Sequence, residues 1–375
     1  MRRFDVLVVG AGPAGSASAI NLARGGARVL LVDKAEFPRD KPCGGGLTGR
    51  ALKRIPVDPT PVVERRVDRF SLRTGYGSSF ARTHQQPVIH MTQRRRLDAF
   101  LVEEAERAGA TFSGGVKVAD LAFDETGVTA RVGRDLVTAT TCLGADGANG
   151  IVARASGISP SIVHGVALEG NVPLETVEID QLERTAVVEL GTVAGGYGWI
   201  FPKGDHANLG VGGWGSEGPR LRAHLDELAR RNGVDTQLLT DVRGHRLPMR
   251  RPGAPAHRGR ALLVGDAAGL VDPLSGDGMY EAFTSARLAA DAILSGDLDG
   301  YSAALAAALD RHAHASWAAK RALDRHPRLV FAAARAPGVF GVVARILCGE
   351  LAHPADARGV ARGPLKLIAR LAGPR

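Results

Sequence analysis

A glycine-spaced turn near the N-terminus constrains the fold of this chain more than any other feature. Residues 4–34 read FDVLVVGAGPAGSASAINLARGGARVLLVDK: a β-branched apolar run, a group of glycines, a helical pattern ended by Gly-Gly, and a second apolar run. This order predicts a strand, a tight turn, a helix and a second strand. One such βαβ unit in a 375-residue chain indicates an α/β fold with length for a second domain.

The spacing inside this turn indicates a nucleotide site. Gly10 allows the tight turn, Gly12 lets the backbone approach a pyrophosphate, and Gly15 brings the helix close to the strand. The N-terminus of the helix offers free N–H groups to negative charge. Asp33 ends the second strand and can accept a hydrogen bond from a ribose hydroxyl, so FAD or NAD fits better than NADP. The alternative is a structural turn in an ordinary α/β domain.

A second strand-to-helix turn lies at residues 260–283, RALLVGDAAGLVDPLSGDGMYEAF. We expect its strand to join the same sheet. Asp266 is placed to bond the ribityl chain of a flavin, and the helix that begins at Gly278 and Met279 would put partial positive charge beside the flavin ring. A nicotinamide dinucleotide has no ribityl chain. FAD therefore explains both turns with one ligand.

The rest of the pattern favours an α/β chain in which a Rossmann-like FAD-binding domain is interleaved with an antiparallel-sheet substrate domain and followed by helices. Residues 161–215 alternate apolar and polar positions, as strands do. The chain is Ala-rich and helical from residue 278 to about residue 325, and a mixed helical tail broken by Pro and Gly follows. We expect a discontinuous FAD-binding domain at 1–60, 93–158 and 256–300, a substrate-binding sheet domain at 61–92 and 159–255, and a helical region at 301–375.

Composition argues against nucleic acid as a partner. The 48 Lys and Arg exceed the 39 Asp and Glu, which gives a formal net charge of +9. Arginine supplies most of this charge and is scattered, and the one run, RRR at 94–96, has no interleaved aromatics. A negatively charged substrate or membrane surface fits the surplus better.

Cysteine and histidine spacing favour neither a disulfide framework nor a metal site. The chain has three cysteines, Cys43, Cys142 and Cys348, which form no CxxC pair. We therefore expect the protein to be in the reducing environment of the cytoplasm. No Ser-His-Asp arrangement or metal-binding histidine spacing is legible. Asp5 interrupts the first apolar run, so this run does not look like a signal peptide. The chain has no uncharged stretch of 18 residues, so we expect no membrane-spanning helix.

Four motifs together resemble the FAD-dependent oxidoreductases with a p-hydroxybenzoate hydroxylase-like fold: GAGPAG, RRRLD, GADGANG and LVGDAAGLVDPLSGDGM, in that order over residues 4–295. Two further stretches resemble the geranylgeranyl reductase family, whose members reduce isolated double bonds of isoprenoid chains. They are FPRDKPCGGGL at 37–47 and GGYGWIFPKG at 195–204. The YxWxFP pattern is the most specific of these signals.

The resemblance implies a role for each matching position. The ADP half of FAD would be held by Gly10, Gly12, Ala14, Gly15 and Asp33. The backbone of Val118 would bond the adenine edge, and Arg94 would contact the cofactor from the start of its helix. Cys43 and Gly44 would lie against the flavin, and its ribityl–isoalloxazine end would meet Asp266, Gly278 and Met279. Tyr197, Trp199 and Phe201 would line the substrate cavity.

Two positions depart from the family pattern. After GADG, Gly150 and Ala153 replace a serine and one of two paired arginines, so that Arg154 alone remains; this puts the docking of a pyridine nucleotide in doubt. Asp277 stands where the family often has glutamate, which does not affect the FAD assignment.

Two of these assignments have structural alternatives. The Cys43 thiol is a candidate proton donor, but cysteine also serves as a small buried apolar side chain. Tyr197, Trp199 and Phe201 alternate along a strand and share one face, which fits either a cavity wall or ordinary sheet packing.

The family resemblance implies reduction of a prenyl diphosphate, a prenylated quinone or an ether lipid. A hydride would pass from flavin N5 to one alkene carbon, and a proton from an acid or water would reach the other, in a dry apolar tunnel. NAD(P)H and ferredoxin both stay open as the external reductant. The alternatives are a monooxygenase or halogenase acting on an aromatic, although a halogenase-like WxWxIP stretch is not reproduced, and a flavoprotein without turnover.

The C-terminal tail, residues 359–375, has an amphipathic pattern. Leu367, Ile368 and Leu371 form an apolar stripe flanked by Lys366 and Arg370. Such a helix either lies in a membrane interface or docks on the body of the protein. The first alternative would make the protein a peripheral membrane protein, which suits a prenyl substrate dissolved in the bilayer.

Overall fold

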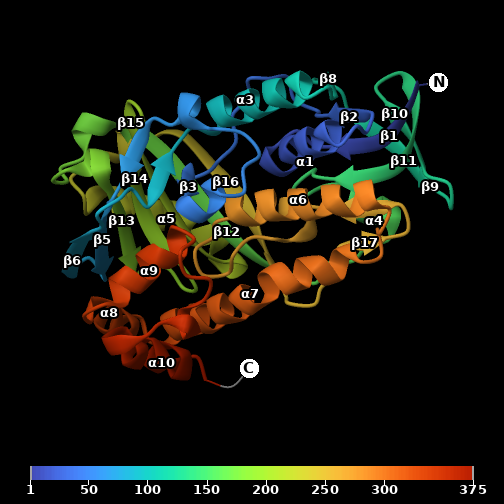
Figure 1. The fold of residues 1–375 in the computed structure, drawn as a ribbon. Helices are drawn as coiled ribbons and strands as arrows, with labels where there is room; N and C mark the ends of the chain where they lie inside the picture. The colour runs from blue at the N-terminus through green and yellow to red at the C-terminus, as the bar shows by residue number, and fades with distance from the viewer. Residues whose placement is uncertain (1, 374–375) are drawn as a thin grey trace.

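The computed structural model describes residues 2–373 and shows two large sheets, with helices on the first and a helical C-terminal region below the second (Figure 1). The last two residues of the predicted tail, 374–375, and residue 1 lie outside the described part. The α/β fold class predicted from the first βαβ unit is confirmed.

The first sheet joins both glycine turns. Its main order is β17 (His257–Arg258), β18 (Ala261–Leu263), β11 (Asp135–Gly144), β1 (Arg2–Val9), β2 (Val29–Val32) and β8 (Thr111–Ser113), and β10 (Val128–Val132) and β9 (Val118–Phe123) extend it from β11. β11 runs parallel to both β1 and β18. Parallel strands end at the same sheet edge, so the turns after β1 and β18 open on one side, as predicted.

Helices cover the buried strands of this sheet. The apolar runs of β1 and β2 are buried on both faces, as a parallel sheet requires. α1 (Pro13–Arg24) packs against both α3 (Arg94–Arg107) and α6 (Met279–Ser295). α4 (Val152–Ser156) lies beside β11 and β18, and α2 (Gly49–Leu52) contacts α6.

The second sheet is mostly antiparallel. Its order is β16 (Thr240–Arg250), β12 (Ile162–Pro173), β15 (His206–Trp214), β14 (Tyr197–Pro202), β13 (Thr185–Leu190), β5 (Arg69–Thr74) and β6 (Ser78–Thr83). One pair departs from the prediction, because β13 runs parallel to β5. The two strands come from distant segments, so no hairpin turn forces them to be antiparallel.

One face of the second sheet carries its own core. The apolar side of α5 (Leu221–Arg230), with Leu225 and Leu228, packs on β15 and β12. A small sheet of β3 (Gly46–Thr48), β7 (Ile89–Met91) and β4 (Arg65–Val67) is not hydrogen-bonded to either large sheet, but it shares a core cluster with Ala186 of β13. The domain boundaries drawn from the sequence remain predictions.

The helical run predicted from residue 278 to about residue 325 is interrupted once, and the broken helical tail predicted after it is confirmed. α6 ends at Gly296, which adopts the left-handed conformation (φ +78°), and α7 (Tyr301–Arg325) begins after a short turn. α8 (Pro327–Arg335), α9 (Val339–Leu347) and α10 (Arg362–Leu371) follow. α10 packs against α7 and α8, so this part of the tail docks on the body of the protein (Figure 1).

No helix within residues 2–373 is by itself long and apolar enough to cross a bilayer. α8 and α9 reach that length and composition only when taken together, and they meet at 92°.

We expect Tyr301→Phe to destabilise the protein by about 1–3 kcal/mol. Tyr301 is fully buried, and its hydroxyl donates to the Leu263 carbonyl (2.7 Å) at the end of β18, so the variant leaves that acceptor short of a donor. Urea unfolding measures the change. Tyr280→Phe is the control, because it keeps the ring that stacks on Arg50. An unfolding free energy for Tyr301→Phe equal to that of the control would contradict the assignment.

Candidate functional site

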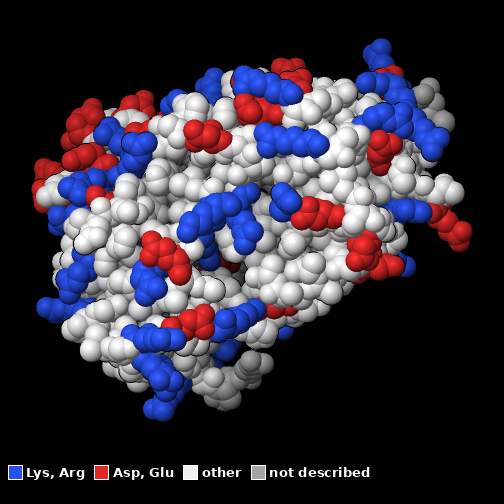
Figure 2. Space-filling view, in the orientation of Figure 1, with Lys and Arg blue, Asp and Glu red and all other residues white. Residues whose placement is uncertain are grey.

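A cavity of about 1290 Å³ lies between the two large sheets and the C-terminal helices. It exceeds the roughly 300–1000 Å³ of a pocket for one small ligand, so it has room for more than one molecule. The molecular surface is hollowed near the centre of the face in Figure 2. Of the site residues predicted from the sequence, all except Gly15 line this cavity.

The first glycine turn is shaped by close backbone contacts. Gly10 has φ +102°, and a side chain there would place its Cβ 2.3 Å from the Ala145 carbonyl oxygen. A Cβ on Gly15 would lie 1.8 Å from the Gly10 oxygen, so Gly15 packs the helix against the turn instead of lining the cavity. Asp33 accepts hydrogen bonds from the N–H groups of Ala11 (2.8 Å) and Ala35 (2.9 Å).

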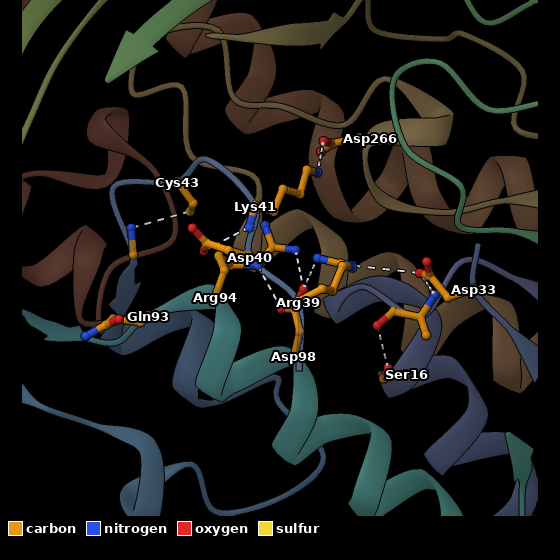
Figure 3. Close-up of polar contacts among 12 residues, drawn as sticks. Ser16, Asp33, Arg39, Asp40, Lys41, Cys43, Gln93, Arg94, Asp98 and Asp266 are labelled. Atoms are coloured by element: carbon orange, nitrogen blue, oxygen red, sulfur yellow. Dashed lines mark hydrogen bonds and ion pairs between the residues drawn. The ribbon is translucent and has the colours of Figure 1, made fainter. Parts of the chain in front are cut away.

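Two guanidinium groups lie over this turn. A Cβ on Gly12 would be 3.7 Å from Nη2 of both Arg39 and Arg94. Arg94 is buried and donates two hydrogen bonds of 2.7 Å to Asp98. Burial alone would lower the pKa of Arg94, but the Asp98 carboxylate outweighs burial and raises that pKa. Arg39 lies between Asp98 (2.8 Å) and Asp33 (3.8 Å), as Figure 3 shows. These cations suit a pyrophosphate.

Arg39 was missed by the sequence reasoning. Its stretch, FPRDKPCGGGL, drew attention only to the cysteine and the glycines. The one available signal was a cation a few residues after Asp33, which does not by itself place a side chain over the glycine turn.

The second turn carries a paired carboxylate. Asp266 accepts from Lys41 Nζ (3.3 Å; Figure 3) and lies 3.4 Å from His245 Nε2. Burial would raise the pKa of Asp266, but Lys41 and His245 outweigh it and hold that pKa well below its usual range. Neither partner was predicted. Gly278 caps α6, and the Met279 N–H already donates to the Asp277 carboxylate (2.8 Å).

The loop at residues 41–45, here called the cysteine–glycine loop, contacts the second sheet directly. The Cys43 N–H donates to Glu169 Oε1 (2.6 Å) on β12, and a Cβ on Gly44 would lie 3.1 Å from the Phe201 ring. Gly45 has φ +76°, and a Cβ there would be 2.0 Å from Lys203 Nζ. The backbone of this loop is therefore held flat against the wall that carries the aromatic rings.

The three aromatics share one face of β14, and their side chains line the cavity. The Trp199 centroid lies 6.1 Å from Tyr197 and 6.3 Å from Phe201. The neighbouring strand makes room for them, since a Cβ on Gly210 would come within 2.0 Å of the indole ring. The Tyr197 hydroxyl donates to the Ser275 carbonyl and so ties this wall to the second turn.

The far end of the cavity is built from the C-terminal helices and is mostly apolar. Its lining there includes Leu323 of α7, Val330 of α8, Val343 and Leu347 of α9, and Leu365 and Ile368 of α10. The predicted apolar stripe of the tail thus contributes Ile368 to the inside of the protein, while Leu367 stays exposed.

Comparison with known proteins agrees with this geometry. The FAD binding domain family matches residues 3–296. The menaquinone reductase of Mycolicibacterium smegmatis is 33% identical over 333 residues, which cover 83% of this chain and 81% of that protein. The chloroplastic geranylgeranyl diphosphate reductase of Arabidopsis thaliana is 30% identical over 80% of this chain and 67% of that protein. The chain belongs to the geranylgeranyl reductase family of FAD-dependent oxidoreductases.

Solved structures show the same fold. A geranylgeranyl bacteriochlorophyll reductase-like protein of Thermoplasma acidophilum is 26% identical, with a TM-score of 0.78 over 86% of this chain and 88% of that chain. The flavin-dependent brominase Bmp2 matches 98% of both chains with a TM-score of 0.75, but at 20% identity it shows the fold alone.

The family members' cofactor fits the cavity. The tight glycine turn, the two guanidinium groups over it and Asp33 suit the ADP half of FAD, and the second turn opens on the same cavity. The protein binds FAD and is an FAD-dependent oxidoreductase. Individual FAD contacts remain predictions.

We expect Asp33→Ala and Asp266→Ala each to weaken FAD binding by about 1–3 kcal/mol, the cost of removing a charged hydrogen-bond acceptor. Titrating the apoprotein with FAD and following flavin fluorescence measures the change. Asp33→Asn is a matched control, because its amide oxygen can still accept from Ala11 and should retain part of the affinity. Unchanged affinity in either alanine variant, with the fold intact by circular dichroism, would remove that residue from the site.

Proposed function

We propose that this oxidoreductase saturates carbon–carbon double bonds of an isoprenoid chain. FAD, when bound in its reduced form, supplies the hydride from N5. The observation that carries the proposal is the continuity of the cavity: the two FAD turns form one end, the Tyr197–Trp199–Phe201 row forms a side, and apolar residues of α7–α10 close the other end. The names of the relatives support the same substrate class.

An isolated alkene lacks an activating group, so its reduction depends on position and on the exclusion of water. The apolar end of the cavity can hold a prenyl chain in one orientation, while the aromatic row lies beside the loop at Cys43. The aromatic row and the mostly apolar lining of the cavity support the first requirement directly, and the apolar lining favours the second because it offers water few hydrogen-bond partners.

Basic groups at the helical end favour a substrate with an anionic headgroup. Lys320, Arg362 and Lys366 line the cavity on α7 and α10. Lys320 donates to the Gly195 carbonyl and lies 4.4 Å from the Trp214 ring centroid, and burial lowers its pKa to about 8. Among the prenyl substrates compatible with the family, a prenyl diphosphate complements these charges best.

The expected outcome is direct reduction of a prenyl diphosphate. Under anaerobic conditions, protein with chemically reduced FAD and geranylgeranyl diphosphate should return to oxidised FAD and yield products heavier by two hydrogens per bond saturated. Flavin absorbance and mass spectrometry measure the two changes. Fully saturated phytanyl diphosphate is the control and should leave the flavin reduced.

Two results would overturn this function. Oxygenated or halogenated aromatic product formed under air with NAD(P)H would favour a monooxygenase or halogenase. A bound flavin that stays reduced with geranylgeranyl diphosphate, a prenylated quinone and an unsaturated ether lipid alike would favour a binding role without turnover.

We infer that the surface of α8–α10 contacts anionic membrane lipid. Residues 327–373 carry seven Lys and Arg against two Asp and Glu. Of the seven large apolar side chains exposed within residues 2–373, four lie here: Leu329, Val343, Val360 and Leu367. Lys and Arg side chains stand among uncharged surface over these helices in Figure 2. Val343 also lines the cavity, so lipid contact would lie next to the substrate chamber.

We expect Leu367→Asp to weaken binding to vesicles of anionic lipid about tenfold, because it removes apolar contact and adds a repelled charge. Co-sedimentation measures the bound fraction. Leu136→Asp is the matched control: Leu136 is equally exposed (45% against 47%) but lies on β11 of the first sheet, far from these helices in Figure 1. If both variants pellet like the unaltered protein, this surface is no membrane contact. Deleting residues 362–375 is a poorer test, because Leu365 and Ile368 also line the cavity.

A further inference from the structure

Glu169 is a buried carboxyl group that the sequence reasoning did not single out. It lies on β12 and lines the cavity together with Gly165 and Ala167 of the same strand face. Its Oε1 accepts the Cys43 N–H at 2.6 Å. The side chain therefore stands where the cysteine–glycine loop meets the wall of the second sheet.

The strand register places Glu169 in one row with the aromatic wall. Trp199 on β14 and Glu169 on β12 both lie opposite Gly210 of β15. Because Gly210 has no side chain, the indole extends across that strand toward β12. The Trp199 N–H itself donates to Asn208 (2.8 Å), which fixes the ring in this position. A substrate lying on Trp199 would be next to the Glu169 carboxyl.

The charges around Glu169 come from three other elements. Lys203 follows β14, and Asp40 directly precedes the cysteine–glycine loop. Arg243 lies opposite Glu169 on β16. Arg243 is paired with Asp40 (3.0 Å), and Lys203 donates to the carbonyls of Cys43 (3.3 Å) and Thr92 (3.1 Å).

Burial dominates this environment. It raises the pKa of Glu169, and the opposing effects of Lys203, of the Cys43 N–H and of the Asn208 side chain do not cancel that rise. Burial likewise lowers the pKa of Lys203. The shift of Glu169 favours the neutral, protonated form of the glutamic acid.

Other acidic groups on the cavity wall are less suited to give up a proton to a substrate. Asp266 is kept ionised by Lys41 and His245, and the Tyr197 hydroxyl is committed to the Ser275 carbonyl. Burial also raises the pKa of Asp277, but this carboxyl belongs to the second turn of the FAD-binding side, where it accepts from Met279. Of the three carboxyl groups compared, Glu169 alone is on the sheet that carries the aromatic row.

We propose that Glu169 is the proton donor of the reaction, a role that rests on the proposed alkene reduction. The hydride from reduced FAD forms a C–H bond at one alkene carbon, and the Glu169 carboxyl proton forms the second C–H bond at the other. The π bond is lost, FAD is left oxidised, and Glu169 is left as a carboxylate that regains a proton from water. The role falls to Glu169, whereas the Cys43 thiol serves as a neighbouring contact.

The direction of the pH dependence follows from this role. The acid acts in its protonated form, so the rate of alkene reduction falls as the pH rises through the pKa of Glu169. A glutamine has no such titration, so the same limb of the profile is absent in Glu169→Gln.

The test compares two glutamates. In Glu169→Gln the amide oxygen still accepts the Cys43 N–H, so FAD binding should be unchanged, while alkene-driven flavin reoxidation should slow by roughly 10²–10⁴-fold. Glu189→Gln is the matched control. Glu189 is buried on β13 of the same sheet, accepts a backbone N–H from Tyr76 (2.9 Å) and has a pKa raised by burial. Its neighbours Val188 and Leu190 line the cavity, so Glu189 points to the other face and its variant should react normally.

A second measurement does not depend on turnover. The infrared difference between unaltered protein and Glu169→Gln, both without substrate, should contain the carbonyl band of a protonated carboxylic acid near neutral pH. The band should disappear as the pH is raised. Its absence throughout would show that Glu169 is ionised and would overturn the assignment.

The outcomes separate this inference from the function on which it rests. If unaltered protein does not reduce geranylgeranyl diphosphate, a prenylated quinone or an unsaturated ether lipid, the proposed function fails and the role of Glu169 fails with it. If unaltered protein reduces one of them and Glu169→Gln does so at the same rate with the same pH profile, only the assignment of Glu169 is wrong. An equal loss in Glu189→Gln would also overturn it, since burial and not position would then decide the effect.

Discussion

The short loop at residues 41–45 joins the parts of the site that the two sheets contribute. Its first residue, Lys41, pairs with Asp266 after the last parallel strand of the first sheet. Two residues later, the Cys43 N–H binds Glu169 of the second sheet, and its carbonyl accepts from Lys203. These contacts set where the loop lies relative to both sheets, and the cavity exists in the space that they define. Gly44 and Gly45 are needed here because the loop is pressed against Phe201 and Lys203.

The aromatic wall depends on a complementary pattern of missing side chains. Tyr197 and Trp199 lie opposite Gly212 and Gly210 of β15. A side chain at Gly210 would overlap the indole, so the large rings on one strand are compatible only with small residues on the next. The same pattern brings Trp199 and Glu169 into one row across an intervening strand. Size complementarity between neighbouring strands therefore creates a chemical neighbourhood as well as a packed wall.

The C-terminal helices have two environments at once. Ile368 and Leu365 face the cavity, while Leu367 and Arg370 are exposed. Of the two alternatives for this amphipathic segment, docking on α7 and α8 is present in the structure. Docking leaves enough exposed apolar and basic surface for a lipid contact, because a helix has more than one face and packing occupies only part of it.

The sequence by itself determined the features that depend on neighbouring residues. The βαβ unit, the glycine spacing, Asp33 and the alternation of Tyr197, Trp199 and Phe201 are all written in stretches shorter than a strand–helix–strand unit. Backbone conformation and side-chain direction follow local periodicity, so the FAD fold and the cavity-facing row were predictable. The second turn was recognisable for the same reason, even though its strand pairs with β11 and not directly with β1.

Only the tertiary structure decided which distant side chains meet. Glu169 lies 126 residues from Cys43, and Lys41 lies 225 residues from Asp266, and no spacing rule connects such pairs. Arg39, His245 and Lys203 reach the site in the same way, and the parallel pairing of β13 with β5 also joins distant segments. A charged residue in a sequence has many possible partners, and the packing of the sheets determines which of them it contacts. Burial then raises the pKa of Glu169, which is why the acid that we propose is visible only in the folded chain.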